Sequence, residues 1–255
     1  MRIVQFTDTH LVSDSGEKFL GVDTFLTLSL ATEIAMSLTP LPKVMIVTGD
    51  IAERGDSATY SRFREIFEPL SVPVYVVPGN HDDDLVMKNI FHGSNIKSTD
   101  HVVINDHLFI FVDSHVKAKP HGFLSAETLA NVENLLKTHA DKPVVISMHH
   151  PVSSPCPALG CQLQNESELL QALKHTHQVV TLLSGHLHKA IDESMGSIRL
   201  LTTPSTFAQC EHPEDGQYAN LNSFWGTHKM DTTRRGFRTL DFQDSSLFKT
   251  EIHWF

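Results

Sequence analysis

The sequence predicts an α/β fold with mainly parallel strands. Five short apolar runs rich in valine and isoleucine recur along the chain, and runs of this kind are typical of strands buried on both faces. Segments with a helical apolar period lie between several of them, as in strand–helix–strand units. Each run also stops abruptly in a polar cluster. The five runs cover residues 3–6, 44–47, 74–77, 144–148 and 179–184.

Four segments have the apolar spacing of helices. The first, residues 23–38, has apolar side chains close to a 3.6-residue period, and Pro40 lies just beyond its end. The others cover residues 57–70, 125–138 and 166–175. Their alternation with the strands predicts parallel pairing, with ligands bound beyond the carboxyl ends of the strands.

Two features interrupt this alternation. Residues 101–112 predict a hairpin that turns at Asn105-Asp106. The chain from Ile198 onward is rich in strand-forming residues, with a turn at Gly196-Ser197 and a last strand near 249–253. There is no repeat, low-complexity tract or linker, so a single domain over residues 1–255 is expected.

Composition places the chain among globular proteins, with 40% hydrophobic and 20% charged residues. The N-terminus lacks the charged and apolar regions of a signal peptide, and no apolar stretch is long enough to span a membrane. The cytoplasm is therefore the expected location. Three cysteines predict no disulfide framework, and the Cys156–Cys161 spacing favours ordinary reduced thiols over a metal or redox pair.

The formal net charge of −10 disfavours a nucleic-acid polymer as a partner, because phosphate backbones are bound through clustered lysine and arginine. A small phosphate ester remains compatible with this charge if bound cations reverse the local field. The basic segment 234–238 is expected to be a solvated face. The final Trp254-Phe255 is expected to belong to the core or to fray, although packing on a partner subunit in a homodimer is an alternative.

The polar clusters after the five strands supply candidate metal ligands. Carboxylate and amide oxygens mixed with imidazoles suit manganese, iron or zinc better than calcium or magnesium. Seven donors are too many for one ion and suit two if one carboxylate bridges, as in two-metal hydrolysis at phosphorus. Asp50 is the expected bridge, because Gly49 allows a tight turn beside it. The seven are Asp8, His10, Asp50, Asn80, His149, His186 and His188.

Each motif alone has a plainer explanation. The segment Asp8–His10 could be a turn and cap, Gly49-Asp50 a turn, and Asn80 or Asp82 a helix N-cap. Two histidines two residues apart, as at His186 and His188, also occur by chance. Together, and each after a buried strand, they favour a metal site.

The full motif set resembles that of the calcineurin-like metallophosphoesterases. This resemblance implies a four-layer αββα sandwich of two mixed sheets, classed as α/β or, by some schemes, α+β. It implies one metal held by Asp8, His10, Asp50 and His188, and a second held by Asp50, Asn80, His149 and His186. It also gives His81 the role of stabilising or protonating the leaving oxygen, with Asp82 orienting His81. His150 is expected to be an outer or structural residue.

Segments between the motifs resemble the class III 3',5'-cyclic-nucleotide phosphodiesterases. They include residues 20–24, 120–125, 201–206 and 236–240. This resemblance implies hydrolysis of 3',5'-cyclic AMP to 5'-AMP by a hydroxide that two metal ions activate, most often iron or manganese, with zinc as a further option. The expected substrate contacts are His10, Asn80, His81, His188, Ser205 and Thr206, although the last two also fit a plain strand-to-loop transition.

Two alternatives stay open. The first is a broader phosphoesterase that acts on 2',3'-cyclic nucleotides, nucleotide diphosphate derivatives or phosphomonoesters. The second is a non-catalytic scaffold of the same fold, which the complete ligand set disfavours.

Overall fold

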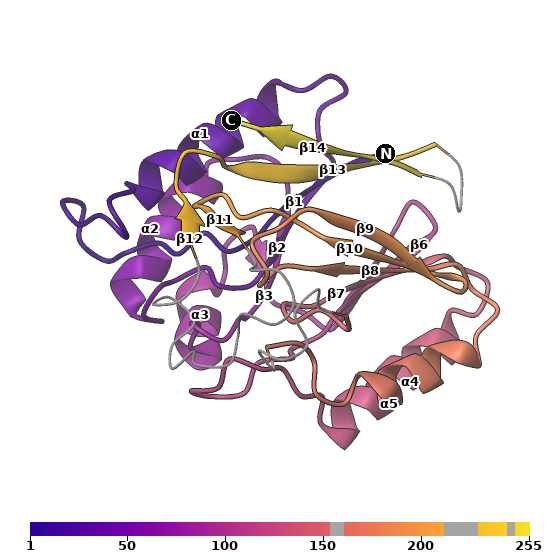
Figure 1. The fold of residues 1–255 in the computed structure, drawn as a ribbon. Coiled ribbons are helices and arrows are strands. Elements are labelled where there is room, and N and C mark those ends of the chain that lie inside the picture. The colour runs from indigo at the N-terminus through magenta and orange to yellow at the C-terminus, as the bar shows by residue number, and fades with distance from the viewer. Residues whose placement is uncertain (154–160, 212–228, 244–247) are drawn as a thin grey trace.

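The chain folds into two six-stranded sheets that lie face to face, with helices on the two outer faces (Figure 1). The computed structural model describes residues 1–153, 161–211, 229–243 and 248–255. The predicted α/β class and the sandwich of two mixed sheets flanked by helices are confirmed.

The first sheet has the strand order β14-β13-β1-β2-β3-β4, in which β1 to β4 are parallel and β13 and β14 are antiparallel. Its strands are β1 (Arg2–Phe6), β2 (Val44–Thr48), β3 (Val74–Val77), β4 (Ile96–Lys97), β13 (Gly236–Phe242) and β14 (Phe248–Trp254). Three of the five predicted strands therefore lie side by side here, with their carboxyl ends at one edge.

The second sheet has the order β5-β6-β7-β8-β10-β9, with a parallel centre and antiparallel edge strands β5 and β9. Its strands are β5 (His101–Ile104), β6 (His107–Phe111), β7 (Val144–Ser147), β8 (Val180–Ser184), β9 (Ile191–Met195) and β10 (Ile198–Thr202). A separate pair consists of β11 (Gln209–Glu211) and β12 (Lys229–Asp231).

Three apolar layers hold these elements together. Along β1, Val4 and Phe6 contact the helices on the outer face, whereas Ile3 lies between the two sheets. The layer between the sheets also contains the stacked rings of Tyr75 and Phe111, with centroids 4.9 Å apart. Because the central strands are buried on both faces, their sequences lack the polar alternation of half-exposed strands.

The helices are α1 (Thr24–Ser37), α2 (Ser57–Phe67), α3 (Asp84–Phe91), α4 (Ala126–Thr138) and α5 (Glu166–Lys174). The first three cover the outer face of the first sheet, and α4 and α5 cover that of the second (Figure 1). Side chains of Asp23, Asp56, Asp83 and Ser125 cap α1 to α4. Within the described part of the chain, no helix is long and apolar enough to cross a bilayer.

The four predicted helices are confirmed to within about three residues at their ends, whereas α3 was not predicted. The hairpin between β5 and β6 is confirmed. Both of its turn residues, Asn105 at φ 46° and Asp106 at φ 61°, have the left-handed backbone that two-residue hairpins require. The turn at Gly196-Ser197 joins β9 to β10. Cys161 and Cys210 are buried, and Cys156 lies outside the described residues.

The prediction of a solvated basic face at 234–238 holds for the exposed Arg234 but is wrong for Arg238. Arg238 is only 2% exposed, and its guanidinium donates hydrogen bonds to neutral oxygens of Thr202, Thr203, Ile191 and Thr250. Burial in this environment lowers the pKa of Arg238 to about 10. Arg238 thus ties β13 to the second sheet, because a buried guanidinium needs an acceptor for each of its donors.

The aromatic C-terminus lies against the edge of the first sheet. Trp254 is 40% exposed and lies under the guanidinium of Arg234, which is 3.8 Å from the ring centroid. Phe255 is half-buried against the outer core and exchanges two backbone hydrogen bonds with Arg235. The C-terminus therefore packs against its own chain.

Candidate metal centre

The seven predicted ligands meet where the carboxyl ends of the two sheets come together. Asp8 and His10 follow β1, Asp50 follows β2 and Asn80 follows β3, all in the first sheet. The other three follow strands of the second sheet and are His149 after β7 and His186 and His188 after β8. The site therefore depends on the packing of one sheet against the other.

One cluster of donors consists of Asp8, His10 and His188. The Nε2 atoms of His10 and His188 are 3.3 Å apart, and His188 Nε2 is 3.3 Å from Asp8 Oδ1. All three side chains are buried, and their ligand atoms lie within 4.8 Å of one another. Asp50 borders this cluster, with its Oδ2 3.8 Å from His10 Nε2.

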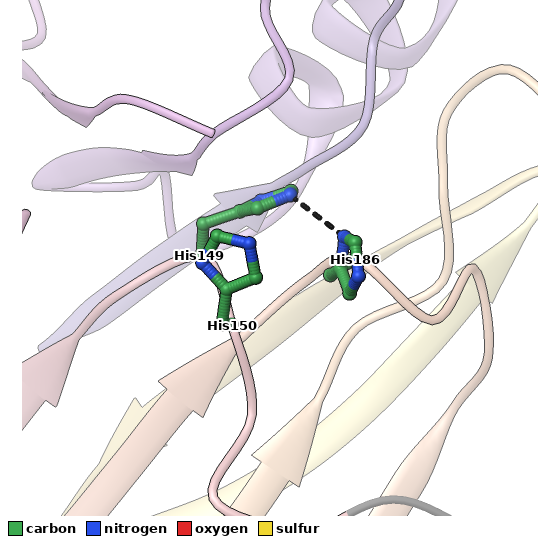
Figure 2. A group of neighbouring side chains, drawn as sticks. All are labelled: His149, His150 and His186. Carbon is green, nitrogen blue, oxygen red and sulfur yellow. Dashed lines mark hydrogen bonds between the residues drawn. The ribbon is translucent and has the colours of Figure 1, made fainter. Parts of the chain in front are cut away.

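A second cluster gathers around His149 Nε2. This nitrogen lies 3.1 Å from His186 Nδ1, 3.1 Å from Asn80 Oδ1 and 3.3 Å from Asp50 Oδ2 (Figure 2 shows the two histidines). Asp50 Oδ2 is thus close to both clusters. The geometry matches the predicted bridge between two ions.

The spacing of these donors fits metal ions. Two ligands bound to one ion at about 2.1 Å, at angles of 90–109°, lie about 3.0–3.4 Å apart. The five distances of 3.1–3.3 Å given above fall in this range, whereas the 3.8 Å between Asp50 Oδ2 and His10 Nε2 lies outside it. The donors combine carboxylate, amide and imidazole groups, which suit first-row transition ions. The residues present therefore fit two cations.

Strained backbone accompanies the ligands. Five of them have the left-handed backbone that residues with a side chain rarely adopt, with φ between 44° and 68°. They are Asp8, His10, Asp50, His186 and His188. Such strain costs free energy and persists only where the surrounding structure enforces it, as at functional sites.

Outer hydrogen bonds fix the ring orientations. Nδ1 of His149 lies 2.8 Å from Thr48 O, and Nδ1 of His188 lies 2.8 Å from Ala208 O. Because a carbonyl oxygen only accepts, each Nδ1 carries a proton, and each Nε2 is the nitrogen that would bind a cation at the centre. His10 follows the same pattern with a carboxylate, since its Nδ1 lies 2.8 Å from Glu53 Oε2.

The electrostatics keep the two buried carboxylates ionised. Burial opposes ionisation of Asp8, but neighbouring His188 and His149 lower its pKa to about 2. Burial likewise opposes ionisation of Asp50, yet His149 and His81 hold its pKa well below the ordinary value. In turn, burial disfavours the charged form of His149, but Asp50 raises its pKa to about 9. In the metal-free protein, the imidazolium of His149 thus supplies positive charge beside Asp50 that bound cations would otherwise supply.

Glycines leave the room that this packing needs. A Cβ on Gly79 would collide with the carboxylate and the backbone nitrogen of Asp50. A Cβ on Gly49 would meet the His149 ring, and the φ of +85° at Gly49 also favours glycine. The prediction that Gly49 permits a tight turn beside the ligands agrees with this geometry.

His81 lines the cavity beside the ligands, and Glu53 holds it there. His81 Nδ1 lies 3.1 Å from Glu53 O and 3.4 Å from Glu53 Oε2, and the His81 amide donates to Asp50 Oδ1. Burial opposes protonation of His81, but Asp50 and Glu53 outweigh it, so the pKa of His81 is raised. Glu53 therefore contacts both a predicted ligand, His10, and the predicted catalytic histidine.

The described hydrogen bonds of the Asp82 carboxylate go to backbone amides of two ligand loops and to Tyr60, and not to the His81 ring. Its carboxylate accepts from the amides of Ile51, Ala52 and Gly79 and from the hydroxyl of Tyr60. Burial and the charge of Asp50 raise the pKa of Asp82 to about 6. Asp82 thus connects the Asp50 loop to the loop that carries Asn80 and His81. Its predicted effect on the orientation of His81 would act through the backbone of these loops.

Ser205 and Thr206 are completely buried, so neither presents its side chain to the cavity. The hydroxyl of Ser205 donates to Asp8 O at 2.7 Å and accepts from the amides of Phe207 and Ala208. The amide of Thr206 donates to Thr7 O. Ser205 thus supports the loop that carries Asp8, and contact of either residue with substrate stays a prediction.

His150 forms a third group of imidazoles with His149 and His186 (Figure 2). Its Nδ1 lies 2.9 Å from Ser114 Oγ, and its Nε2 has no hydrogen-bond partner among the described residues. Burial, together with the charges of His186 and His149, holds the pKa of His150 well below its ordinary value, so the ring is neutral. The position of His150 beside His186 agrees with its predicted role as an outer or structural residue.

A cavity of about 200 Å³ opens above the two clusters. The ligand loops contribute Asp50, Asn80, His81, His186 and His188, and the loop after β6 contributes Ala118, Lys119 and Pro120. Glu53 and Lys119 were not among the predicted site residues. The position of Glu53, three residues after Asp50, was the available signal for it, whereas nothing local distinguishes Lys119 from other exposed lysines.

Comparisons with known proteins find similar phosphoesterases. A model of the calcineurin-like phosphoesterases matches residues 1–190. The chain is 31% identical over 260 residues to the 3',5'-cyclic adenosine monophosphate phosphodiesterase CpdA of Escherichia coli (strain K12), with 99% of this chain and 89% of that protein covered. It is 34% identical over 217 residues to a probable glycerophosphodiester phosphodiesterase GpdQ of Arcobacter nitrofigilis, covering 80% and 78% of the two chains.

Among solved structures, a dimetal phosphatase from Danio rerio superposes with a TM-score of 0.69 at 15% identity. The match covers 99% of this chain and 95% of that one. At this identity the likeness establishes the fold alone.

Proposed function

Because this chain belongs to the calcineurin-like phosphoesterases, a family of metal-dependent hydrolases, we propose that it hydrolyses 3',5'-cyclic AMP to 5'-AMP with two bound metal ions. The observation that carries the proposal is the convergence of seven donors in two clusters that share Asp50. The similarity to a cyclic AMP phosphodiesterase over nearly the full chain supports the choice of substrate.

The proposed ligands divide between two ions. Asp8, His10, Asp50 and His188 would hold the first, and Asp50, Asn80, His149 and His186 would hold the second. When bound, such a pair supplies a hydroxide nucleophile at neutral pH and stabilises the entering and departing oxygens at phosphorus. We propose iron or manganese, with zinc as a further option, since the donors are oxygen and imidazole nitrogen without thiolate.

His81 supplies the proton that the leaving group needs. Its Nδ1 faces Glu53, so Nε2 is the nitrogen that would face a substrate in the cavity. As the bond between phosphorus and the 3' oxygen breaks, that oxygen takes the proton from His81. Glu53 also favours the protonated ring, because its carboxylate oxygen lies 3.4 Å from His81 Nδ1.

A second candidate substrate class is a glycerophosphodiester. The observation that favours it is the 34% identity to the probable GpdQ protein, which is higher than the 31% to the CpdA protein but covers less of the chain. Both substrates are phosphodiesters with one negative charge, so the same ligands and His81 would serve either.

A substrate panel tests the proposal. The manganese-loaded protein is incubated with 3',5'-cyclic AMP, 2',3'-cyclic AMP, a glycerophosphodiester and a phosphomonoester, and kcat/KM is measured for each. We expect 3',5'-cyclic AMP to rank first, with 5'-AMP as the product. A ranking far below the 2',3'-cyclic nucleotide or the monoester would reject cyclic AMP as the substrate. Fewer than one ion per chain after metal loading would instead favour the non-catalytic scaffold.

We also propose that residues 1–255 form one domain, since both sheets share the apolar layer between them. A homodimer and a cytoplasmic location stay predictions from the sequence.

A further inference from the structure

Among the described residues that line the metal-centre cavity, Lys119 is the one lysine. The cavity volume of about 200 Å³ corresponds to a sphere about 7 Å across. Lys119 lines it together with Asp50 and His186, which belong to the predicted metal ligands. A group of phosphate size that fills this space therefore lies within reach of both the metal ligands and the lysine.

The loop that carries Lys119 is attached at its base. After β6, the amide of Phe123 donates to Ser114 O at 3.0 Å, and Gly122 O accepts from the amide of Gln164 at 2.9 Å. Gly122 also packs so closely on the His150 ring that a Cβ there would lie 2.6 Å from its Cγ. The base of the loop is thus attached to the outer histidine of the metal centre.

The tip of the loop has an enforced shape. Ala118 has a left-handed backbone with φ 58°, which costs free energy for a residue with a side chain. The amide of Lys119 then donates to Val116 O at 2.9 Å and closes the turn. This turn places Ala118, Lys119 and Pro120 together on the cavity wall.

The charge of Lys119 is uncompensated within the described part of the chain. No described carboxylate oxygen lies within 4 Å of its amine, whereas several other lysines and arginines form ion pairs. The whole chain carries a net charge of −10, so the positive charge of Lys119 beside this cavity is opposite in sign to that of the protein as a whole. An anion that enters the cavity would be attracted to it locally.

We propose that Lys119 binds a non-bridging oxygen of the substrate phosphate and so sets the affinity of the site for anionic phosphodiesters. The inference rests on the proposed function, in that the substrate is taken to be a phosphodiester. A lysine ammonium acts on phosphate as a point charge at the end of a flexible stem, which tolerates small changes in phosphate position. Because the ground state and the transition state both carry the charge, Lys119 contributes mainly to KM.

The test compares two matched variants of the metal-loaded protein. Lys119→Gln removes the charge at nearly constant length, and Lys117→Gln makes the same change two residues away, outside the cavity lining. We expect Lys119→Gln to raise KM for 3',5'-cyclic AMP and for bis(p-nitrophenyl) phosphate about tenfold, with kcat within twofold of wild type. Lys117→Gln should leave both unchanged. Added salt should raise the wild-type KM more than that of Lys119→Gln.

Two probes separate this inference from the proposed function. If cyclic AMP is not hydrolysed, bis(p-nitrophenyl) phosphate still reports the effect of Lys119 on an anionic diester. Calorimetric binding of inorganic phosphate measures the same contact without catalysis, and Lys119→Gln should weaken it about tenfold. Equal KM and phosphate Kd for Lys119→Gln and Lys117→Gln would overturn the inference and leave the metal centre untouched.

Discussion

Replacing Gly79 by alanine should disable the metal centre through a single methyl group. The φ of Gly79 lies outside the left-handed region, so alanine meets no backbone penalty there. Its Cβ would nevertheless collide with the carboxylate and the backbone nitrogen of Asp50. A side chain could rotate away, but the backbone nitrogen cannot, so the two loops must separate by about 1 Å.

A displacement of this size at reacting groups costs on the order of 100-fold in rate, which corresponds to about 2.7 kcal/mol in the activation barrier. Overpacking of the buried loop should cost about 1–3 kcal/mol of folding stability. We expect Gly79→Ala to be folded, with kcat/KM for a phosphodiester reduced about 100-fold and less than two bound ions per chain.

The assay combines steady-state hydrolysis, metal analysis and thermal unfolding. Gly16→Ala is the matched control, because its added Cβ would lie 3.5 Å from Asp14 Oδ1, an ordinary contact, and its φ is not left-handed. Activity of Gly79→Ala within about threefold of the Gly16→Ala control would refute the reasoning that the approach of Gly79 to Asp50 sets the ligand geometry.

Three further predictions concern the ligands and the residues beside them. Asn80→Ala should lower metal content and activity together, whereas His81→Ala should reduce kcat about 10²–10⁴-fold with normal metal content, as measured by kinetics and elemental analysis; equal metal loss in both would contradict the role of His81. Glu53→Ala should weaken metal binding about 10–100-fold in a chelator competition, because His10 loses the acceptor at 2.8 Å from its Nδ1. Glu53→Gln keeps an acceptor oxygen and should bind metal nearly normally, so similar losses in both variants would count against this explanation. The metal-free protein should lose stability as the pH rises from about 6.5, where unfolded histidine titrates, to about 9, because the raised pKa of His149 stabilises the fold only while the ring is protonated beside Asp50. Unfolding curves across this range should stay level for the metal-loaded protein, in which the ring is a neutral ligand, and parallel curves for both forms would argue against this.

The candidate ligands could be found from the sequence because each follows a buried strand. Parallel strands bring their carboxyl ends to one edge, so residues as distant as Asp8 and His188 were predicted to meet. The sequence alone did not indicate which strands belong to which sheet. That division decides that Asp50 reaches His149 across the interface between the sheets.

The sequence did not predict the contacts that the ligands make with main-chain atoms or with residues away from the strand ends. The acceptors that orient His149 and His188 are carbonyl oxygens, which carry no sequence signal. Glu53 was not among the predicted site residues, and only the fold brings its carboxylate to both His10 and His81. Helix α3 was missed because it has only eight residues.

Arg238 was misplaced for a related reason. Three arginines within five residues indicate a solvated face when only local composition is considered. In the structure, Arg238 lies on β13, a buried strand of the first sheet, and its guanidinium donates to oxygens on β9 and β10 of the second sheet, which are distant in sequence. The hydrogen bond from the Ser205 hydroxyl to Asp8 O likewise depends on the fold and was not predicted.

The two-metal centre that shares Asp50 is tested most directly by an anomalous-difference map from crystals grown with manganese. The structure predicts two peaks about 3.5–4 Å apart, one on each side of the Asp50 carboxylate. A single peak, or a peak enclosed by His149, His150 and His186 instead of beside Asp50, would contradict it.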